Sequence, residues 1–522
     1  MRSFRIAATL PPIFLALASL GCGINNVTQP SKPAITTTSN PLVAQYSFQA
    51  FQAGLTAWVE FGTDTNYGRQ TSVLQDSSTT LRPHTVSILV AGMLPQTTYH
   101  MRAHVDWPGG SWVDQDRTFT TGALPTDPPF PQFTVTGGAP GSSTASSPGV
   151  ELLSLVNTSG APVMHAVVTD QKGNVIWFCP VAALPIKPLD NGHYIVVTFS
   201  DLLEIDLACN TIRDISLPQM NQSLQAHGYS FPPLNIFHHD VLVLPNGHWI
   251  ALAQVTKNFD DLPGYPGTTG VLGDVLLDID PNGEVVWAWS AFDHTITSSP
   301  PDVLDINRHL IAFPDWTHSN ALVYTADGNL LLSMRHQSWV LKIDYANGTG
   351  KGDILWRLGQ DGDFTLLAGD STQWFYAQHY PNILSSDGSK TNLAVWDNGN
   401  LRIEADGTAC GSTQTAPACY SRATIFQIDE STHLANMLWQ DLPGFFSQWG
   451  GSIVTLANGN NVEFDMTSPV DQATPVNQST SQIMEVTQTD NPQLVWQMNV
   501  SGANAYRAYR IPSLYPGVTW QQ

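Results

Sequence analysis

Residues 278–287 read DIDPNGEVVW: an apolar run closed by an acidic residue, a Pro-Asn-Gly turn, and a second run that ends in tryptophan. Asn-Gly between two short Val/Ile-rich runs is typical of a β-hairpin. The pattern recurs at VTDQKGNVIW (168–177), EIDLACNTIRDI (204–215), KIDYANGTGKGDILW (342–356), QIDESTHLANMLW (427–439) and EVTQTDNPQLVW (485–496). Six copies indicate one structural unit used repeatedly.

A second hairpin signal precedes five of these copies: LDNGHYIVV (189–197), LPNGHWIAL (244–252), TADGNLLLS (325–333), SSDGSKTNLAV (385–395) and LANGNNVEF (456–464). Two hairpins supply four strands, which is one blade of a propeller. We therefore expect an all-β chain whose residues 150–522 form a six-bladed β-propeller. Five or seven blades are the alternatives.

The first copy lacks a preceding hairpin of its own. We expect 151–178 to form the outer half of the last blade, with AYRAYRIPSLYP (505–516) as its inner part. Such a closure fixes both ends of the repeat and leaves no free sheet edge. The repeated tryptophans are expected to be packing residues between blades: Trp177, Trp287, Trp356, Trp439 and Trp496.

The region before the repeat contains three other segments. Residues 23–40 are rich in Ser, Thr, Asn and Pro and are expected to be a tether, and the Pro/Gly/Ser-rich 122–149 a linker. Between them, 41–121 is expected to be a small β-sandwich. Its Leu-Pro-x-Thr-x-Tyr run, ending at Tyr99, resembles the tyrosine corner of the fibronectin type III fold.

Residues 1–22 have the form of an export signal, because Arg2 and Arg5 precede an apolar stretch that ends in small residues. The end, LASLGC, resembles a lipoprotein cleavage site with Cys22 as the lipid-bearing residue; an ordinary secretory signal is the alternative. We expect a periplasmic protein or a membrane-anchored lipoprotein. Four further cysteines predict two disulfides, for which we favour Cys179–Cys209 and Cys410–Cys419 among three connectivities.

The net charge is −22, from 21 Lys+Arg against 43 Asp+Glu. This balance argues against nucleic acid as a partner, since binding it requires a basic surface. An anionic substrate could be held only by a few local arginines and histidines.

Three segments share a histidine at the start of a strand: FHHDVLVLPNG (237–247), WTHSNALVYTADGN (316–329) and YAQHYPNILSSDG (376–388). A turn glycine follows His238, His318 and His379 after 9, 10 and 9 residues. Equivalent positions in neighbouring blades can meet in the central channel. Clustered neutral imidazoles are candidate nucleophiles and bases near pH 7.

Other polar residues accompany these histidines. Asp240 and Asn320 lie two residues after a histidine and share its face in a strand. A slip of one residue would exchange His238 for His239, so both remain candidates. Arg335, in LLSMRHQSWVLKID (331–344), has apolar flanks that indicate burial, which requires an anionic ligand or a structural aspartate.

The chain resembles the bacterial arylsulfate sulfotransferase family in an ordered set of motifs: DWTHSN (315–320), SMRHQSWVLKID (333–344), WRLG (356–359), the Gln-His of YAQHYPN (376–382), VWDNGNLR (395–402) and YRAYRIPSLYP (506–516). The resemblance covers about 150–516, and the expected sandwich is similar to the N-terminal domain of that family. It implies a six-bladed propeller that moves a sulfuryl group from a phenolic sulfate ester to a phenol by ping-pong through a sulfohistidine. It also implies no cofactor and a homodimer.

Carried onto this chain, the resemblance makes His379 the nucleophile, with His318 and His238 (or His239) assisting and Arg335 holding the sulfuryl group. Asn320 is a candidate substrate-binding residue. Trp374, Phe375 and Tyr376 precede His379 and could form an apolar mouth for aryl rings, or simply pack a loop.

Three other functions are weighed against transferase activity. Clustered His and Asp could hold a transition metal, but no short-spaced ligand motif links them and Arg335 would repel a cation, so no metal is expected. A non-catalytic exported propeller that binds a polysaccharide or a protein is the main alternative. A quinone-dependent dehydrogenase is a weaker one.

Overall fold

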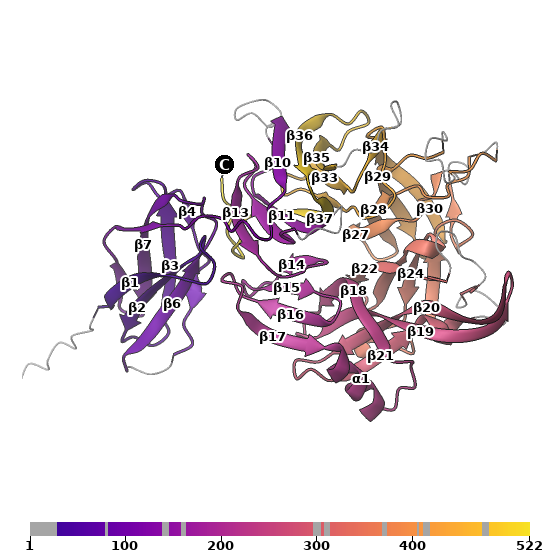
Figure 1. Ribbon diagram of the computed structural model, residues 1–522, viewed down its shortest axis with the longest axis horizontal. Coiled ribbons are helices and arrows are strands. Elements are labelled where there is room, and N and C mark those ends of the chain that lie inside the picture. Colours follow the sequence, from indigo (N-terminus) through magenta and orange to yellow (C-terminus); the bar gives the residue numbers. More distant parts are fainter. Residues whose placement is uncertain are drawn as a thin grey trace, which may run out of the picture.

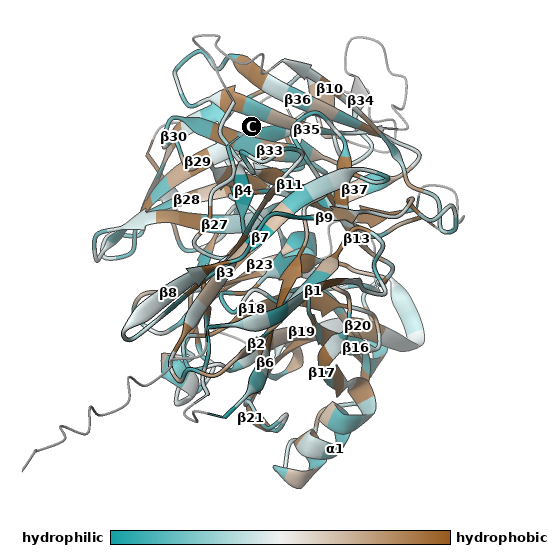
Figure 2. Ribbon diagram, turned by 90° about the vertical axis from the view of Figure 1, so that its left-hand side faces the viewer, coloured by the Kyte–Doolittle hydropathy of each residue, from teal (hydrophilic) through white to brown (hydrophobic). Residues whose placement is uncertain are grey.

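The computed structural model describes residues 29–78, 82–137, 146–157, 163–295, 304–306, 314–367, 373–404, 407–410, 418–471 and 480–521. The chain is mostly β, as expected, and its described part has one α-helix, α1 (Leu217–Ala226), at the periphery against β17 and β21 (Figure 2). Three short 3₁₀ helices complete the elements: η1 (Ala291–His294), η2 (Arg335–Gln337) and η3 (Ala346–Gly348). The expected export signal and Cys22 lie outside the described residues.

Two sheets form the N-terminal sandwich at one side of the molecule (Figure 1). The first contains β1 (Ser31–Thr37), β2 (Ala44–Ala50) and β6 (His84–Val90), and the second contains β3 (Thr56–Gly62), β4 (Arg69–Gln70), β5 (Leu74–Gln75), β7 (Thr98–Trp107), β8 (Gly110–Val113) and β9 (Arg117–Thr120). The Tyr99 hydroxyl accepts a bond from the Leu94 amide at 3.0 Å, as a tyrosine corner requires.

Six further sheets of four or five strands follow, arranged around a common centre (Figure 1). Sheet I contains β14 (Ile186–Pro188), β15 (Tyr194–Val197), β16 (Asp201–Ile205) and β17 (Thr211–Ser216). Sheet II contains β18 (Leu234–Val243), β19 (Trp249–Leu262), β20 (Tyr265–Ile279) and β21 (Val285–Ser290). Sheet III contains β22 (Ser319–Tyr324), β23 (Leu330–Met334), β24 (Trp339–Ile343) and β25 (Ile354–Leu358).

The remaining sheets include strands contributed from outside the repeat. Sheet IV contains β26 (Thr365–Leu366), β27 (His379–Ser386), β28 (Lys390–Asp397), β29 (Arg422–Asp429) and β30 (Leu434–Asp441). Sheet V contains β10 (Gln132–Gly137), β32 (Ile453–Thr455), β33 (Asn461–Met466), β35 (Thr480–Thr487) and β36 (Leu494–Ser501). Sheet VI contains β11 (Val150–Val156), β12 (Ala166–Thr169), β13 (Val175–Cys179) and β37 (Asn504–Ile511), and a separate pair joins β31 (Phe445–Phe446) to β34 (Val470–Asp471).

The expected closure is confirmed, because β37 near the C-terminus pairs antiparallel with β11, from Val150 opposite Ile511 to Val156 opposite Asn504. Two expectations about connecting segments are wrong. β1 lies within the expected tether and pairs with β2, and β10 lies within the expected linker and pairs with β36. Both are edge strands. Their Ser/Thr-rich sequence is typical of a loop, but each forms backbone hydrogen bonds with a neighbouring strand.

The repeated tryptophans are buried, as expected, and four of them join neighbouring sheets. The indoles donate to backbone carbonyls in the next sheet: Trp177 to Leu207 at 2.8 Å, Trp287 to Gly350 at 3.0 Å, Trp439 to Thr489 at 2.9 Å and Trp496 to Gln171 at 3.0 Å. The copy in sheet I has Arg213 instead, which donates to the Asp280 carbonyl at 2.6 Å and lies over Trp249. Each of the four indole bonds gives a buried N–H group a hydrogen-bond acceptor and fixes the angle between neighbouring sheets.

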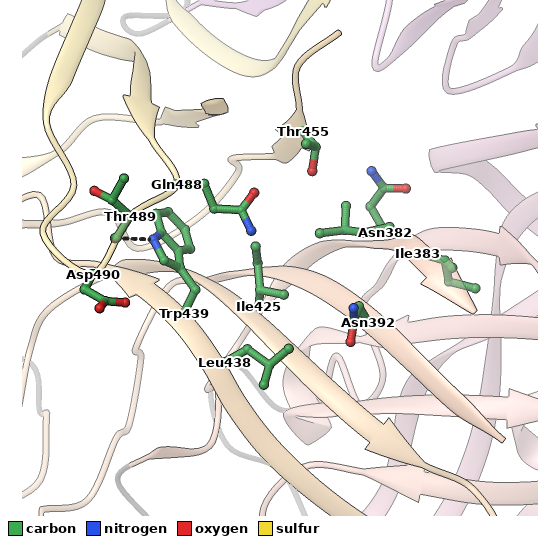
Figure 3. Close-up of a pocket in the computed structure, with 11 residues that line it drawn as sticks. Asn382, Ile383, Asn392, Ile425, Leu438, Trp439, Thr455, Gln488, Thr489 and Asp490 are labelled. Carbon is green, nitrogen blue, oxygen red and sulfur yellow. Dashed lines mark hydrogen bonds between the residues drawn. The ribbon is translucent and has the colours of Figure 1, made fainter. Parts of the chain in front are cut away.

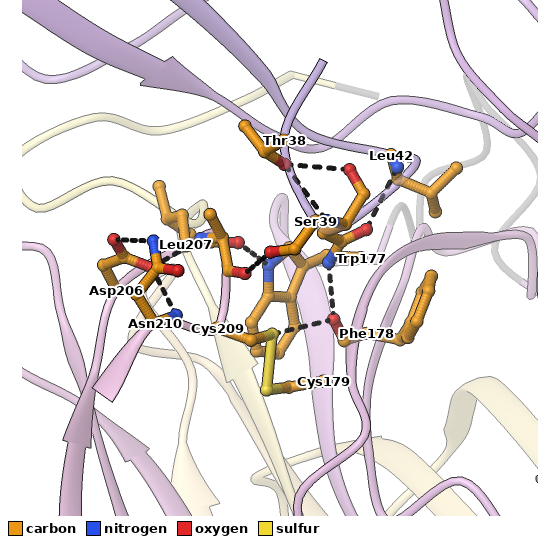
Figure 4. The surroundings of a disulfide bond; sticks show 12 residues. Thr38, Ser39, Leu42, Trp177, Phe178, Cys179, Asp206, Leu207, Cys209 and Asn210 are labelled. Carbon is orange, nitrogen blue, oxygen red and sulfur yellow. Dashed lines mark hydrogen bonds between the residues drawn. A yellow bond between two sulfur atoms is a disulfide. The ribbon is translucent and has the colours of Figure 1, made fainter.

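The sandwich is attached to sheets I and VI at two places. Near the Cys179–Cys209 pair, the Asn40 side-chain amide donates to the Phe178 carbonyl at 2.7 Å (Figure 4). At the C-terminus, the Tyr515 hydroxyl bonds the backbone of Ala91 and Leu89. Cys410 and Cys419 form the second expected pair. Within the described residues, no helix has the length and apolar character that a membrane crossing requires.

Candidate active site

The strands β18, β22 and β27 lie side by side in sheets II, III and IV. His318 directly precedes β22 and His379 begins β27, as expected, whereas His238 and His239 lie within β18 and not at its start. His239, His318 and Tyr380 adopt positive φ angles of 56°, 47° and 49°. Residues other than glycine rarely adopt this conformation, and such strain gathers at functional sites. By this criterion, His239 and His318 occupy equivalent positions in their strands. In the third strand the equivalent position is occupied by Tyr380, and His379 lies one residue before it.

His239 and His318 are in direct contact, with ring centroids 4.8 Å apart. His238 is buried behind them: its Nδ1 lies 2.8 Å from Nδ1 of His239, and its Nε2 lies 3.3 Å from the Asp274 carboxylate. Burial would raise the pKa of Asp274, but its contact with His238 and its hydrogen bonds from Ser319 together hold that pKa below its usual value. Of the two register alternatives, His239 is the one that meets the other histidines.

Arg335 joins the cluster through His336. The His318 and His336 rings are stacked 4.6 Å apart, and Nδ1 of His318 lies 2.6 Å from the Asp315 carboxylate. Arg335 donates to Nε2 of His336 and to the Gln448 carbonyl, both at 2.8 Å. No described carboxylate lies within ion-pair distance of Arg335, and its Nε has no hydrogen-bond partner among the described residues.

His379 is 1% exposed and is held from both sides. Its Nδ1 lies 2.6 Å from Oδ1 of Asn398, whose amide nitrogen donates to the carbonyls of Ser447 and Gly450. Because that amide orientation makes Oδ1 an acceptor, Nδ1 of His379 carries the proton and Nε2 carries the lone pair. The Gly450 amide donates a hydrogen bond to this Nε2 at 3.3 Å.

The electrostatic setting keeps the imidazoles of His239, His336 and His379 neutral. Burial, followed by the charge of Arg335, holds the pKa of His379 well below its usual value. Burial, followed by the neighbouring His318, does the same for His239 and lowers the pKa of His336 to about 4. Burial also lowers the pKa of Arg335 to about 10, which leaves it a cation at neutral pH.

Sheet VI adds two residues that reasoning from the sequence missed. Tyr506 lies edge-on to both His239 and His379, with centroid distances of 5.7 and 6.2 Å. Arg507, fully buried, donates to the Asn320 carbonyl and lies 3.6 Å from the Asp240 carboxylate, which also pairs with Lys187. Tyr506, Arg507 and Asn398 lay within motifs that carried the resemblance, which was the available signal.

A protein-family model for arylsulfotransferases (ASST) matches residues 143–510, about 70% of the chain. The chain belongs to the arylsulfotransferase family. The family supports aryl sulfotransferase activity, with a phenolic sulfate donor and a phenol acceptor, at the level of the family. None of the curated proteins compared matches the chain.

Solved structures resemble the chain only distantly. A protein of unknown function from Bacteroides caccae is 11% identical with a TM-score of 0.37, over 70% of this chain and 100% of that one. A protein from Lactobacillus plantarum is 9% identical with a TM-score of 0.35, over 69% and 98%. An apocarotenoid oxygenase mutant from Synechocystis is 10% identical with a TM-score of 0.30, over 90% and 81%. At these scores the likeness carries no argument.

The other predicted residues lie near the site or beneath it. Asn320 is fully buried and donates to the Gln378 carbonyl at 2.8 Å, while its Oδ1 has no partner among the described residues. Trp374 and Tyr376 are 5% and 4% exposed and belong to an apolar cluster with Phe426. Both side chains therefore pack in the core, as the alternative expectation has it. Their contact with the aryl ring of a substrate stays a prediction.

One group in the site has a ligand set that could bind a metal ion. Candidate ligand atoms of Asp315, His318 and His336 lie within 4.8 Å of one another. However, Nε2 of His336 already accepts a bond from Arg335, whose positive charge opposes a cation. The arrangement is therefore suited to an anion.

A groove of about 520 Å³ between sheets IV and V is separate from the histidines (Figure 3). Sheet IV lines it with Asn382, Asn392 and Trp439, and sheet V lines it with the turn 488–490. The Trp439 indole is committed to the Thr489 carbonyl, so the groove is a seam between sheets.

Proposed function

We propose that the chain is an aryl sulfotransferase that works by ping-pong through a sulfohistidine at His379. The observation that carries this is the state of His379: its Nδ1 proton is held by Asn398, and its Nε2 lone pair lies in a cluster whose nearby guanidinium, Arg335, has no carboxylate partner. A neutral nucleophile next to a cation that forms no ion pair with a described residue is suited to an anionic electrophile.

In the first half-reaction, Nε2 of His379 attacks the sulfur of the donor. The N–S bond forms, the S–O bond breaks, and its electron pair leaves with the phenolic oxygen. Arg335 stabilises the sulfuryl oxygens, and the positive charge that develops on the imidazole is shared with Asn398 through Nδ1–H.

In the second half-reaction, an acceptor phenol attacks the same sulfur and the N–S bond breaks. The proton of the phenol passes to an imidazole of the His239–His318 pair, which can return it to the departing phenolate of the next donor. Two successive displacements at one site avoid the need to hold both phenols in line at once.

The convergence of His239, His318 and Arg335 with the surroundings of His379 favours catalysis over the binding-module alternative. A module that only binds a polysaccharide or protein does not require neutral imidazoles around one guanidinium.

The remaining proposals concern architecture and location. We propose that sheets I–VI are the blades of a six-bladed propeller and that the sandwich of β1 to β9 is a fibronectin type III-like domain. The paired cysteines fit an exported protein. Processing near Cys22, with or without lipidation, and a homodimer belong to the same proposal.

The test is nucleotide-free transfer. Purified protein, p-nitrophenyl sulfate and phenol should give nitrophenol and phenyl sulfate. The His379→Asn variant should be inactive, whereas His248→Asn, which changes a histidine paired with Asp278 in sheet II, should retain activity. Nitrophenol release no faster than that of His379→Asn would reject the assignment.

A further inference from the structure

Tyr506 connects the two halves of the histidine cluster. It lies in β37, the innermost strand of sheet VI, and is 2% exposed. Its ring meets His379 and His239 edge-on, at interplanar angles of 78° and 70°. Among the described residues, no other ring is recorded in contact with both.

The hydroxyl of Tyr506 is buried. The Arg507 side chain approaches it as a hydrogen-bond donor without good alignment, and the proton of the hydroxyl has no acceptor among the described residues. Leaving a buried polar group without a partner costs about 1–3 kcal/mol. By contrast, Tyr509, two residues along the same strand, accepts a bond from Arg507 at 3.5 Å. Phenylalanine would pack as well at 506 without this cost, so the hydroxyl is better explained by a ligand that completes its bonding.

The charges around Tyr506 suit an oxygen that is becoming negative. The charges of Arg507 and Arg335 favour a negative oxygen at its hydroxyl, and the charge of Asp240 opposes it; the Arg507 guanidinium lies 5.3 Å from its ring. Burial raises the pKa of Tyr506 to about 12, so the hydroxyl keeps its proton and can donate.

The backbone of Tyr506 is fixed to the loop that contacts the nucleophile. Its carbonyl accepts a bond from the Gly451 amide at 3.0 Å, and the adjacent Gly450 amide points to Nε2 of His379. Gly451 has a φ of 99°, and a Cβ there would lie 2.4 Å from the Trp396 ring. The loop therefore cannot shift easily, and Tyr506 keeps a constant position relative to His379.

We propose that Tyr506 is a catalytic residue whose hydroxyl donates a hydrogen bond to the phenolic oxygen of the donor while the S–O bond breaks. This rests on the proposed sulfotransferase function. The electron pair of the S–O bond stays on the phenolic oxygen, the proton stays on Tyr506, and the N–S bond forms on His379. In the second half-reaction, the Tyr506 hydroxyl donates the same hydrogen bond to the oxygen of the acceptor phenol. Its contribution is largest for donors whose phenols are weakly acidic, because their oxygens carry the least delocalised charge.

The test compares leaving groups. The kcat/KM of Tyr506→Phe should fall about 10²-fold with phenyl sulfate, a typical loss for one oxyanion donor. It should fall much less with p-nitrophenyl sulfate, so that the dependence of log kcat/KM on phenol pKa becomes steeper. An equal loss for both donors, or no loss, would overturn the proposal.

Two further variants keep the result interpretable. Tyr194→Phe removes another buried tyrosine hydroxyl, bonded only at 3.4 Å to the Leu514 carbonyl, and should leave the slope unchanged. Replacing Tyr506 by 3,5-difluorotyrosine keeps the ring and strengthens the donor, so the slope should become shallower; an unchanged slope contradicts the proposal even if Tyr506→Phe folds poorly. A wild-type protein that transfers nothing refutes the sulfotransferase function itself, whereas an active wild type with unaltered slopes refutes only the role of Tyr506.

Discussion

Two buried arginines of this molecule have opposite surroundings. Arg510, in sheet VI, is enclosed by three buried carboxylates, those of Glu151, Glu463 and Glu485. Arg335, in the histidine cluster, donates only to the neutral acceptors His336 and Gln448. The first arginine is surrounded by an excess of negative charge. The second forms no ion pair with a described carboxylate, and Asp315 acts on it only from a longer distance.

The difference separates a structural ion cluster from a binding site. The carboxylates around Arg510 come from β11, β33 and β35, so the cluster joins sheets V and VI where the two ends of the repeat meet. A buried cation surrounded by neutral donors and acceptors, as at Arg335, is costly until an anion arrives. We interpret that cost as the basis for binding a sulfate ester.

Replacing Arg335 by Met should have the largest effect: a strong loss of activity without a loss of stability. We expect kcat/KM for p-nitrophenyl sulfate to fall about 10³-fold, because the sulfuryl oxygens lose their cation. The thermal midpoint should stay level or rise, because an uncompensated buried charge is removed. Arg335→Lys, which retains charge but not the second donor, should lie between. A loss of stability without loss of activity would contradict the comparison.

Replacing Arg510 by Met should do the reverse. Three carboxylates would be left without their partner, and removing one member of a buried ion cluster costs about 3–5 kcal/mol in the free energy of unfolding. Denaturant unfolding measures this, and the fraction that folds should show nearly wild-type kcat/KM. Unchanged stability would show that the cluster does not support the closure.

Asn398→Leu should reduce kcat/KM by about 10-fold to 10²-fold, because Nδ1 of His379 loses the acceptor that sets its tautomer. Burial and Arg335 hold the pKa of His379 below its usual value, so wild-type activity should persist below pH 6. Asn398→Asp keeps an acceptor and adds a negative charge, which should raise that pKa and move the acid limb of the pH–rate profile upward. Asn392→Leu, in the seam between sheets IV and V, is the matched control. An unmoved acid limb in Asn398→Asp would show that Asn398 does not act through His379.

The smallest expected effect concerns pH and stability at the Arg510 cluster. Burial, and then the carboxylate of Glu151, hold the pKa of Glu463 well above its usual value. A raised pKa in the folded state contributes stability that is complete below the unfolded-state pKa and is lost as pH rises toward the folded-state pKa. Glu463→Gln should remove this loss, so its advantage over wild type grows with pH above about 4.5, by at most about 1.4 kcal/mol per unit. Parallel stability curves would contradict a protonated Glu463.

Local patterns in the sequence were sufficient for the architecture. Asn-Gly and Asp-Gly turns, paired with runs that end in tryptophan, predicted the hairpins, and the missing first hairpin predicted the pairing of β11 with β37. Both cysteine pairs followed from spacing and an exported setting. The strand β10 was missed because its partner, β36, is distant in sequence. The strand β1 pairs with the next strand, β2, and was missed because its composition resembles that of a tether.

The candidate site could be predicted from local sequence patterns only in part. The histidine segments and Arg335 could be recognised, but the choice between His238 and His239 depends on a left-handed residue within a bulge, which periodicity does not reveal. Tyr506 reaches His379 across 127 positions of the chain, and only folding shows that contact. Aromatic residues beside a catalytic histidine in sequence can belong to the core instead, as Trp374 does.

The most direct test of the account is the mass of enzyme quenched after exposure to p-nitrophenyl sulfate without an acceptor. Intact-protein and peptide mass spectrometry under conditions that preserve N–S bonds should find one added SO₃ group, located on His379 and released when phenol is added before quenching. An active enzyme that never carries this group on His379, or carries it elsewhere, would contradict the mechanism.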